Sequence, residues 1–275
     1  VDRLIEGTVL VARGELGTRI NWAKNDELGD LARNFNAMVE RLESTIDQLN
    51  RTNRDLSEYA YAASHDLQEP LRAIAGFLQI LNRRYADSLD AAGREYIDRT
   101  VRASERLQGL IGDLLTYSRI RLDPERIRPV NAERIFDEVV SEVRRNSGGL
   151  PREIRRDSLP VVSTDPDHLR RIFEHLLANA VKFRHPRRKL EIEVTSIRTG
   201  RDWRVSVTDN GVGFDQKYAG QVFDLFKRLH SRESYDGTGV GLALCKRIAE
   251  LYGGEAEARA ETDKGTTVMI HLRNV

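Results

Sequence analysis

The chain has 275 residues, enough for about two domains. Its 44 basic and 43 acidic side chains give a formal net charge of +1, so the composition offers no support for nucleic-acid binding. A single cysteine, Cys245, excludes a disulfide within the chain and indicates a reducing compartment. The longest apolar runs are far shorter than the ~20 residues of a membrane helix, and no signal peptide is visible, so we expect a soluble cytoplasmic fragment.

The first ~45 residues predict a small helical unit. "LIEGTVLVARGELGTRI" (4–20) has helical spacing of its apolar residues, "NWAKNDELG" (21–29) is a polar connector, and a second helix then runs into the next segment. Two helices of this size cannot bury a core by themselves, so we expect this unit to dimerise.

A heptad repeat follows, from Phe35 to Leu81. Six heptads with one polar a residue, Asn53, favour a parallel dimeric coiled coil over a helix buried against its own domain. This register places His65 at position f, facing solvent. Pro70 falls at a d position, where we expect it to bend the helix.

The next elements predict a helical hairpin followed by an α/β domain. A second helix spans about 90–120, and two such hairpins would form a four-helix bundle in the dimer. Pro124 and Pro129 mark a linker. Beyond it, helices and strands alternate in a pattern typical of an α/β domain with a mixed sheet. The expected helices are 131–146, 167–183 and 240–252, and the expected strands are 152–156, 160–163, 189–198, 202–209, 255–261 and 266–272.

Three short motifs in this domain point to nucleotide chemistry. "HLLANAVKF" (175–183) places an amide and a lysine near one helix end, "DNGVGF" (209–214) follows a strand, and "DGTGVGLAL" (236–244) opens a helix whose free backbone N–H groups can bind an anion. Each motif alone is weak, because a glycine-rich loop is more often a simple turn. Their occurrence together in this order is much more specific.

These motifs resemble the boxes of sensor histidine kinase transmitters along essentially the whole chain. "SHDLQEPLR" is similar to the H box, "HLLANAVKF" to the N box, "DNGVGF" to the G1 box, "VFDLFKRLH" to the F box and "GTGVGLAL" to the G2 box. The stretches "ASHDLQEPLR" and "LLTYSR" particularly resemble the corresponding sequences of bacteriophytochrome-type kinases. "RGELGTRI" and "DELGDLARNFNAM" resemble a HAMP module.

The resemblance implies a multidomain chain of α and α/β units. A HAMP-like module at 1–46 and a dimerisation and phosphotransfer hairpin at 47–122 would form a dimeric helical bundle. An α/β sandwich of the GHKL type at 130–275 would bind ATP. The implied activity is ATP-dependent autophosphorylation of a homodimer, with transfer to an aspartate of a response-regulator receiver domain. The implied location is the cytoplasmic portion of a sensor anchored in the membrane through upstream segments.

The resemblance also assigns the phosphoacceptor. His65 is expected to receive the γ-phosphoryl group, and Asp66 to hydrogen-bond one imidazole nitrogen so that the other remains nucleophilic. Transfer would depend on positioning and charge neutralisation.

On the nucleotide side, Asp209 is expected to accept a hydrogen bond from the adenine amino group, and Asn179 to ligate an Mg²⁺ ion that bridges the phosphates. Lys182 and Arg228 are expected to meet phosphate charge, beneath a mobile lid at 214–236. The other expected binding residues lie in the two glycine-rich turns: Gly211, Gly213, Gly237, Thr238, Gly239, Gly241 and Leu242.

Two positions depart from the family pattern. His175 stands where related kinases often have Asn, which puts the Mg²⁺ geometry in doubt. Glu69 stands four residues after the phosphoacceptor, where Thr or Asn positions water in kinases that are also phosphatases. A carboxylate there would repel phosphate, which puts phosphatase activity in doubt.

Two alternative functions are weighed against this one, and the sequence argues against the second of them. A non-catalytic dimeric scaffold would be favoured by loss of His65 or Asn179, and both are present. Another ATPase with this nucleotide fold, of the gyrase or heat-shock chaperone sort, would carry a Glu base at position 175 and would lack an H box.

Overall fold

The computed structural model describes residues 2–12, 16–22, 26–85, 89–147, 154–200, 202–229, 235 and 237–273. The chain forms two compact units, Val1–Ala63 and Ser64–Val275. Helix α2 (Glu27–Tyr85) contributes residues to both, and the units are described separately below.

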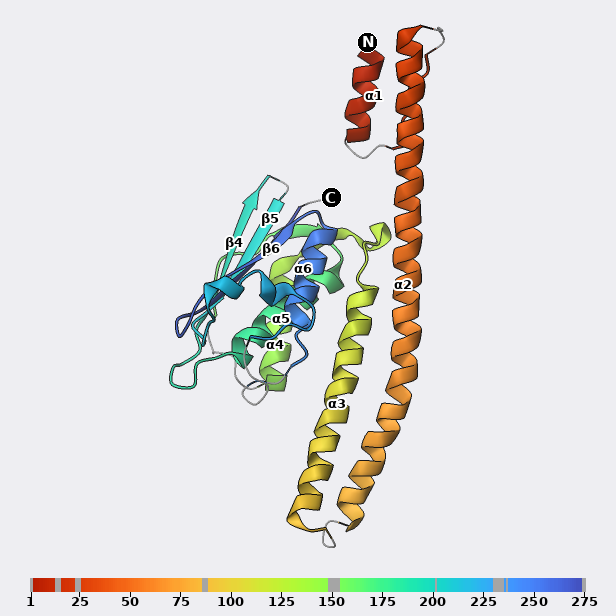
Figure 1. The fold of residues 1–275 in the computed structure, drawn as a ribbon. Coiled ribbons are helices and arrows are strands. Elements are labelled where there is room, and N and C mark those ends of the chain that lie inside the picture. The colour runs from red at the N-terminus through yellow and green to blue at the C-terminus, as the bar shows by residue number, and fades with distance from the viewer. Residues whose placement is uncertain are drawn as a thin grey trace. The chain divides into compact units, whose positions relative to one another are not determined.

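In the first unit, helix α1 (Asp2–Ala12) lies beside the beginning of α2 (Figure 1). The expected helical spacing over 4–20 is wrong for residues 16–20, because residues 16 and 17 form a turn and residues 18–22 have no regular secondary structure. Asn36 holds this connector: its side chain accepts a hydrogen bond from the Ile20 amide and donates one to the Ile20 carbonyl, both at 2.9 Å. Ile20 is thereby fixed in a small core with Ala32, Phe35 and Val39.

Helix α2 confirms the long helix that the heptads predict, and it continues through Pro70 to Tyr85. Large apolar side chains remain exposed at seam positions of the repeat. They are Leu42, Leu49, Leu67, Ile74, Phe77 and Leu81. Exposed apolar residues in this periodicity are typical of a helix that packs against a second copy.

The second unit begins with the predicted helical hairpin. Helix α3 (Ala91–Arg119) runs antiparallel to the end of α2 (Figure 1). The Asp90 carboxylate caps α3 by accepting a hydrogen bond from the Gly93 amide at 2.7 Å. The buried residues of the hairpin are Ser64, Ala75, Ser104 and Ile111.

The expected linker is shorter than the sequence pattern indicates. After the 3₁₀ turn η1 (Pro124–Arg126), strand β1 (Arg128–Asn131) pairs with β3 (Val161–Thr164) in a two-stranded sheet. Pro129 therefore lies in a strand and not in a linker. A two-stranded sheet consists of edges, where a proline can lack its N–H without breaking a central ladder.

The main sheet has five strands in the order β2-β4-β5-β7-β6. Strand β2 pairs parallel to β4 and the other neighbours are antiparallel, which confirms the mixed sheet. The strand bounds are β2 Arg155–Arg156, β4 Ile192–Thr199, β5 Asp202–Asp209, β6 Glu255–Glu261 and β7 Gly265–Leu272.

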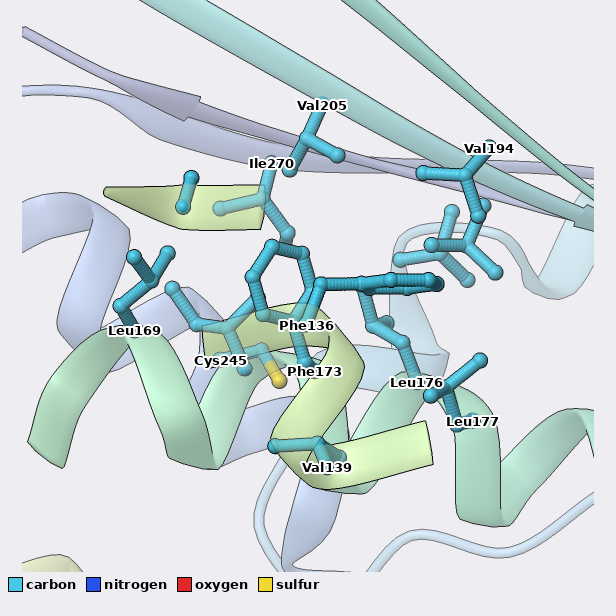
Figure 2. Packing of buried hydrophobic residues seen from close by; sticks show 14 of the residues in the cluster. Phe136, Val139, Leu169, Phe173, Leu176, Leu177, Val194, Val205, Cys245 and Ile270 are labelled. Atoms are coloured by element: carbon cyan, nitrogen blue, oxygen red, sulfur yellow. The ribbon is translucent and has the colours of Figure 1, made fainter. Parts of the chain in front are cut away.

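Three helices cover one face of this sheet (Figure 1): α4 (Ala132–Ser147), α5 (Pro166–Lys182) and α6 (Gly241–Leu251). Figure 2 shows Val194, Val205 and Ile270 of the sheet pointing toward Phe136 of α4 and Phe173 of α5. The two phenyl rings meet edge to face, with centroids 5.1 Å apart. This packed layer fixes α5, the end of β5 and the start of α6 relative to one another.

Candidate nucleotide-binding site

A cavity of about 310 Å³ lies where these three elements meet. Pockets for small ligands begin at about this size. Its lining includes the C-terminal half of α5, the C-terminal end of β5 and the N-terminal part of β7. The start of α6, the segment between β5 and α6, and Asp113 of α3 complete it. It brings together these expected site residues: Asn179, Lys182, Asp209, Gly213, Arg228, Gly237, Thr238, Gly239, Gly241 and Leu242.

Asp209 ends β5 and places a carboxylate in this otherwise largely apolar part of the cavity. Burial raises its pKa to about 6, although the backbone N–H groups of Gly211 and Thr266 favour the ionised form. The Gly211 amide lies 2.8 Å from the carboxylate. A half-buried acceptor held in this way suits recognition of a single N–H edge on a flat, apolar ligand.

Gly211 and Gly213 are required by the turn after Asp209. A Cβ atom at Gly211 would overlap the Phe183 carbonyl oxygen, and one at Gly213 would overlap the Glu261 carbonyl oxygen. Gly213 also has a φ of 59°, in the left-handed region. Gly213 lines the cavity. Gly211 does not line it, but its amide donates a hydrogen bond to the Asp209 carboxylate.

A second part of the cavity lining combines a lysine with the glycine-rich turn before α6. Asn179 and Lys182 lie three residues apart on α5, so both side chains reach the same side of the helix. The Lys182 ammonium lies so close to Gly237 that a Cβ there would overlap it. Gly239 has a φ of 80°, and α6 begins at Gly241. A helix start beside a lysine favours an anionic group.

Arg228 has a different contact from the one expected. Its guanidinium donates to the backbone carbonyl oxygens of Tyr235 and Gly237, the latter at 2.8 Å. Although it lines the cavity, Arg228 here holds the end of the segment that leads into the glycine-rich turn.

Sequence reasoning missed Asp113. Its carboxylate accepts a hydrogen bond from the Thr238 hydroxyl and lies in the cavity. No local motif surrounds Asp113, and it is 125 residues from Thr238 in the chain, so the pairing has no signal in a single sequence. The imidazole of His175, a residue of α5, lies against Gly241 at the start of α6. Burial lowers the pKa of His175, while the nearby Asp113 carboxylate opposes that shift.

The expected phosphoacceptor, His65, belongs to α2. The helix includes His65, but the His65 side chain falls outside the described residues, so its predicted solvent-facing position stays a prediction. Asp66 and Glu69 are exposed. The part of the chain that the structure describes holds no group of three or more His, Cys, Asp or Glu residues that could bind a metal ion.

Family models match three parts of the chain. The HAMP domain model matches residues 1–44, and the His Kinase A (phospho-acceptor) domain model matches residues 55–122. The model described as histidine kinase-, DNA gyrase B-, and HSP90-like ATPase matches residues 164–275.

Two relatives show how far the similarity extends. Cyanobacterial phytochrome A of Nostoc sp. (strain PCC 7120) is 36% identical over 229 residues, which are 83% of this chain and 30% of the relative. The methanogenesis regulatory histidine kinase FilI of Methanothrix harundinacea is 30% identical over 274 residues, 95% of this chain and 29% of the relative. The chain thus spans less than a third of the length of these relatives.

Among solved structures, the full-length ShkA in complex with AMPPNP has the same fold, with a TM-score of 0.58 at 23% identity. The alignment covers 79% of this chain and 46% of ShkA. Taken with the cavity geometry, the matches assign the chain to the sensor histidine kinases, with a HAMP module, a phosphoacceptor hairpin and a GHKL-type ATPase domain in that order. No helix among the described residues is long and apolar enough to cross a membrane.

Proposed function

We propose that this chain uses ATP to phosphorylate His65 and then passes the phosphoryl group to an aspartate of a response-regulator receiver domain. The single observation that carries the proposal is the cavity. It brings the Asp209 carboxylate together with Lys182 and the start of α6, in a chain that also matches the phosphoacceptor domain model. The alternative of a non-catalytic scaffold has no structural feature in its favour, because the described binding residues are brought together.

In this proposal Asp209 accepts a hydrogen bond from the adenine amino group. The glycine-rich turn and Lys182 hold the phosphates, where backbone N–H groups and one ammonium match their charge. Asn179 would hold Mg²⁺, which neutralises charge on the transferred group when bound.

The transfer itself needs one neutral imidazole nitrogen of His65. That nitrogen attacks the γ-phosphorus, the bond from phosphorus to the bridging oxygen breaks, and ADP leaves. Asp66 accepts a hydrogen bond from the other imidazole nitrogen, which keeps the attacking nitrogen unprotonated and stabilises the positive charge that develops. Positioning of His65 against the γ-phosphate supplies most of the acceleration.

The HAMP match supports a further part of the proposal, that input reaches this chain through preceding membrane-anchored segments, with the kinase part in the cytoplasm. Glu69 at the position four after His65 supports a kinase with little phosphatase activity, since its carboxylate would repel a phosphoryl group.

The test is labelling with γ-³²P-ATP and Mg²⁺. Wild type should acquire an acid-labile, alkali-stable label, and His65→Gln should acquire none while still binding ATP. Asp209→Asn should bind ATP weakly and label poorly. An acid-stable label that persists in His65→Gln would refute the phosphoacceptor assignment.

The same two variants also distinguish transfer within a subunit from transfer between subunits. In a mixture of His65→Gln and Asp209→Asn, label above that of Asp209→Asn alone can appear only if a His65→Gln subunit binds ATP and phosphorylates His65 of its Asp209→Asn partner. A mixture that labels at a substantial fraction of the wild-type rate indicates transfer between subunits. A mixture that labels no more than Asp209→Asn alone, with heterodimers demonstrated, indicates transfer within a subunit.

A further inference from the structure

A basic segment follows α5 and reaches the turn that carries Asp209. Within it, one guanidinium nitrogen of Arg188 donates to two backbone carbonyl oxygens, that of Gly211 at 3.3 Å and that of Asp263. Gly211 belongs to the turn after β5, and Asp263 to the turn between β6 and β7. Arg188 therefore ties together two loops that are distant in sequence.

Backbone hydrogen bonds join the same two loops to the end of α5. The Val212 amide donates to the Phe183 carbonyl oxygen at 2.9 Å, and the Asp263 amide donates to the Val212 carbonyl oxygen at 2.7 Å. Asn210 adds a second tie to the basic segment, because its side chain accepts from the Glu191 amide at 3.0 Å and donates to the Lys189 carbonyl oxygen at 2.9 Å. Arg188 is the cationic member of this network, and hydrogen bonds from a charged donor are stronger than neutral ones.

The connection to the nucleotide runs through Gly211. Its amide donates to the Asp209 carboxylate at 2.8 Å, and its carbonyl oxygen accepts from Arg188. Gly211 also packs directly against the Phe183 carbonyl, where no side chain would fit. The position of the Gly211 amide, and with it the direction of the Asp209 carboxylate, thus depends on where Arg188 holds the turn.

We propose that Arg188 is a positioning residue that orients Asp209 toward the exocyclic amino group of the base and so sets the preference for adenine. This inference rests on the proposed function, in which Asp209 reads that amino group. Arg188 does not line the cavity and would not touch the nucleotide. Its effect should therefore appear in base discrimination and not in phosphate binding.

The experiment measures dissociation constants of the whole chain for two nucleotides, ATP and purine riboside triphosphate, which lacks the 6-amino group. Arg188→Ala should weaken ATP binding by about tenfold and change the affinity for purine riboside triphosphate by less than about twofold, because only the former uses Asp209. Arg188→Lys should restore part of the discrimination, since it keeps a cation but loses the planar fork.

Arg187→Ala is the matched control. Arg187 is exposed and adjacent, and its side chain makes no hydrogen bond or ion pair within the described part of the chain. It should behave like wild type with both nucleotides. In an Asp209→Asn background, Arg188→Ala should add little further loss of ATP affinity, because the group that it orients has been changed.

Two results would overturn the role of Arg188 alone. The first is an unchanged ratio of the affinities for ATP and purine riboside triphosphate in Arg188→Ala. The second is an equal loss of affinity for both nucleotides with a lowered melting temperature, which would make Arg188 merely structural. A wild-type protein that binds neither nucleotide, or both equally, would instead overturn the adenine-reading role of Asp209 and the inference with it.

Discussion

At the scale of single residues, the proposed role of Asp209 makes a prediction about pH. Its carboxylate is half-buried at the end of a central strand, and burial raises its pKa to about 6. Above that pH it is ionised and can only accept hydrogen bonds, which suits an amino group. Below it the carboxyl group is protonated and presents an O–H where an acceptor is needed.

We therefore expect ATP affinity to be constant above about pH 7 and to fall as the pH drops through 6, approaching tenfold per pH unit. The direction follows from the raised pKa, because the binding-competent ionised form is lost first on acidification. Dissociation constants measured between pH 5 and pH 8 test this. Because the triphosphate also titrates near pH 6, the comparison is with Asp209→Asn, whose profile should lack the Asp209 component. Parallel profiles for the two proteins would contradict the assignment.

At the scale of elements, periodic patterns predicted most of the fold. Helices α2, α3, α5 and α6 and the antiparallel strands β4 to β7 all follow from hydrophobic spacing, because each buries one regular face. Strand β1 was not predicted, because Pro129 is usually a sign of a break in secondary structure. An edge strand nevertheless tolerates a proline, and Pro129 pairs with Ser163 of β3. In residues 16–20 the apolar side chains have helical spacing, but the backbone there is not helical.

The site divides in the same way. Residues within local motifs, such as Asn179 and the glycines before α6, were predictable because strand–turn–helix geometry follows from sequence. Asp113 and Arg188 were not, since each reaches its partners across a long stretch of chain. No residue pattern specifies the hydrogen bonds from Arg228 to the backbone carbonyl oxygens of Tyr235 and Gly237.

The hydrogen bond between α3 and the glycine-rich turn gives a prediction at this scale. Asp113 places a carboxylate in the cavity and holds Thr238. Asp113→Asn should bind ATP about threefold to tenfold more tightly, because a negative charge near the phosphates is removed. Calorimetric titration with ATP measures the change, and raising the salt concentration should shrink the difference.

Glu105→Gln is the matched control for that variant. Glu105 is an exposed carboxylate on the same helix and does not line the cavity. Neutralising it should leave ATP affinity within about twofold of wild type, given how strongly water screens an exposed charge. If Asp113→Asn binds ATP more weakly than wild type, the prediction is wrong. The hydrogen bond from Thr238 to Asp113 would then stabilise the turn in the conformation that binds ATP, and this effect would outweigh the repulsion between the carboxylate and the phosphates.

At the scale of the whole molecule, the heptad seam is what joins the HAMP module to the kinase. The repeat runs along α2 without interruption, and six of its apolar seam residues, from Leu42 to Leu81, are exposed in a single chain. Leu49, at a d position, has 64% of its surface exposed, and it belongs to a periodic row of exposed apolar residues of the kind that a second copy covers. Dimerisation is thus the expected condition for signalling and for phosphotransfer alike.

Leu49→Lys should weaken the dimer strongly, because each subunit would lose the burial of a leucine and place a like charge opposite its own copy. Losing about 1.5 kcal/mol or more per leucine amounts to at least ~100-fold in the dimer dissociation constant. Gln48→Lys adds the same charge one residue away, off the seam, and should stay dimeric. Sedimentation velocity over a dilution series measures both, and autophosphorylation at the same concentrations shows whether activity follows the dimer fraction. If Leu49→Lys dissociates no more readily than Gln48→Lys, the seam is not the dimer interface and the coupling from the HAMP module must take another route.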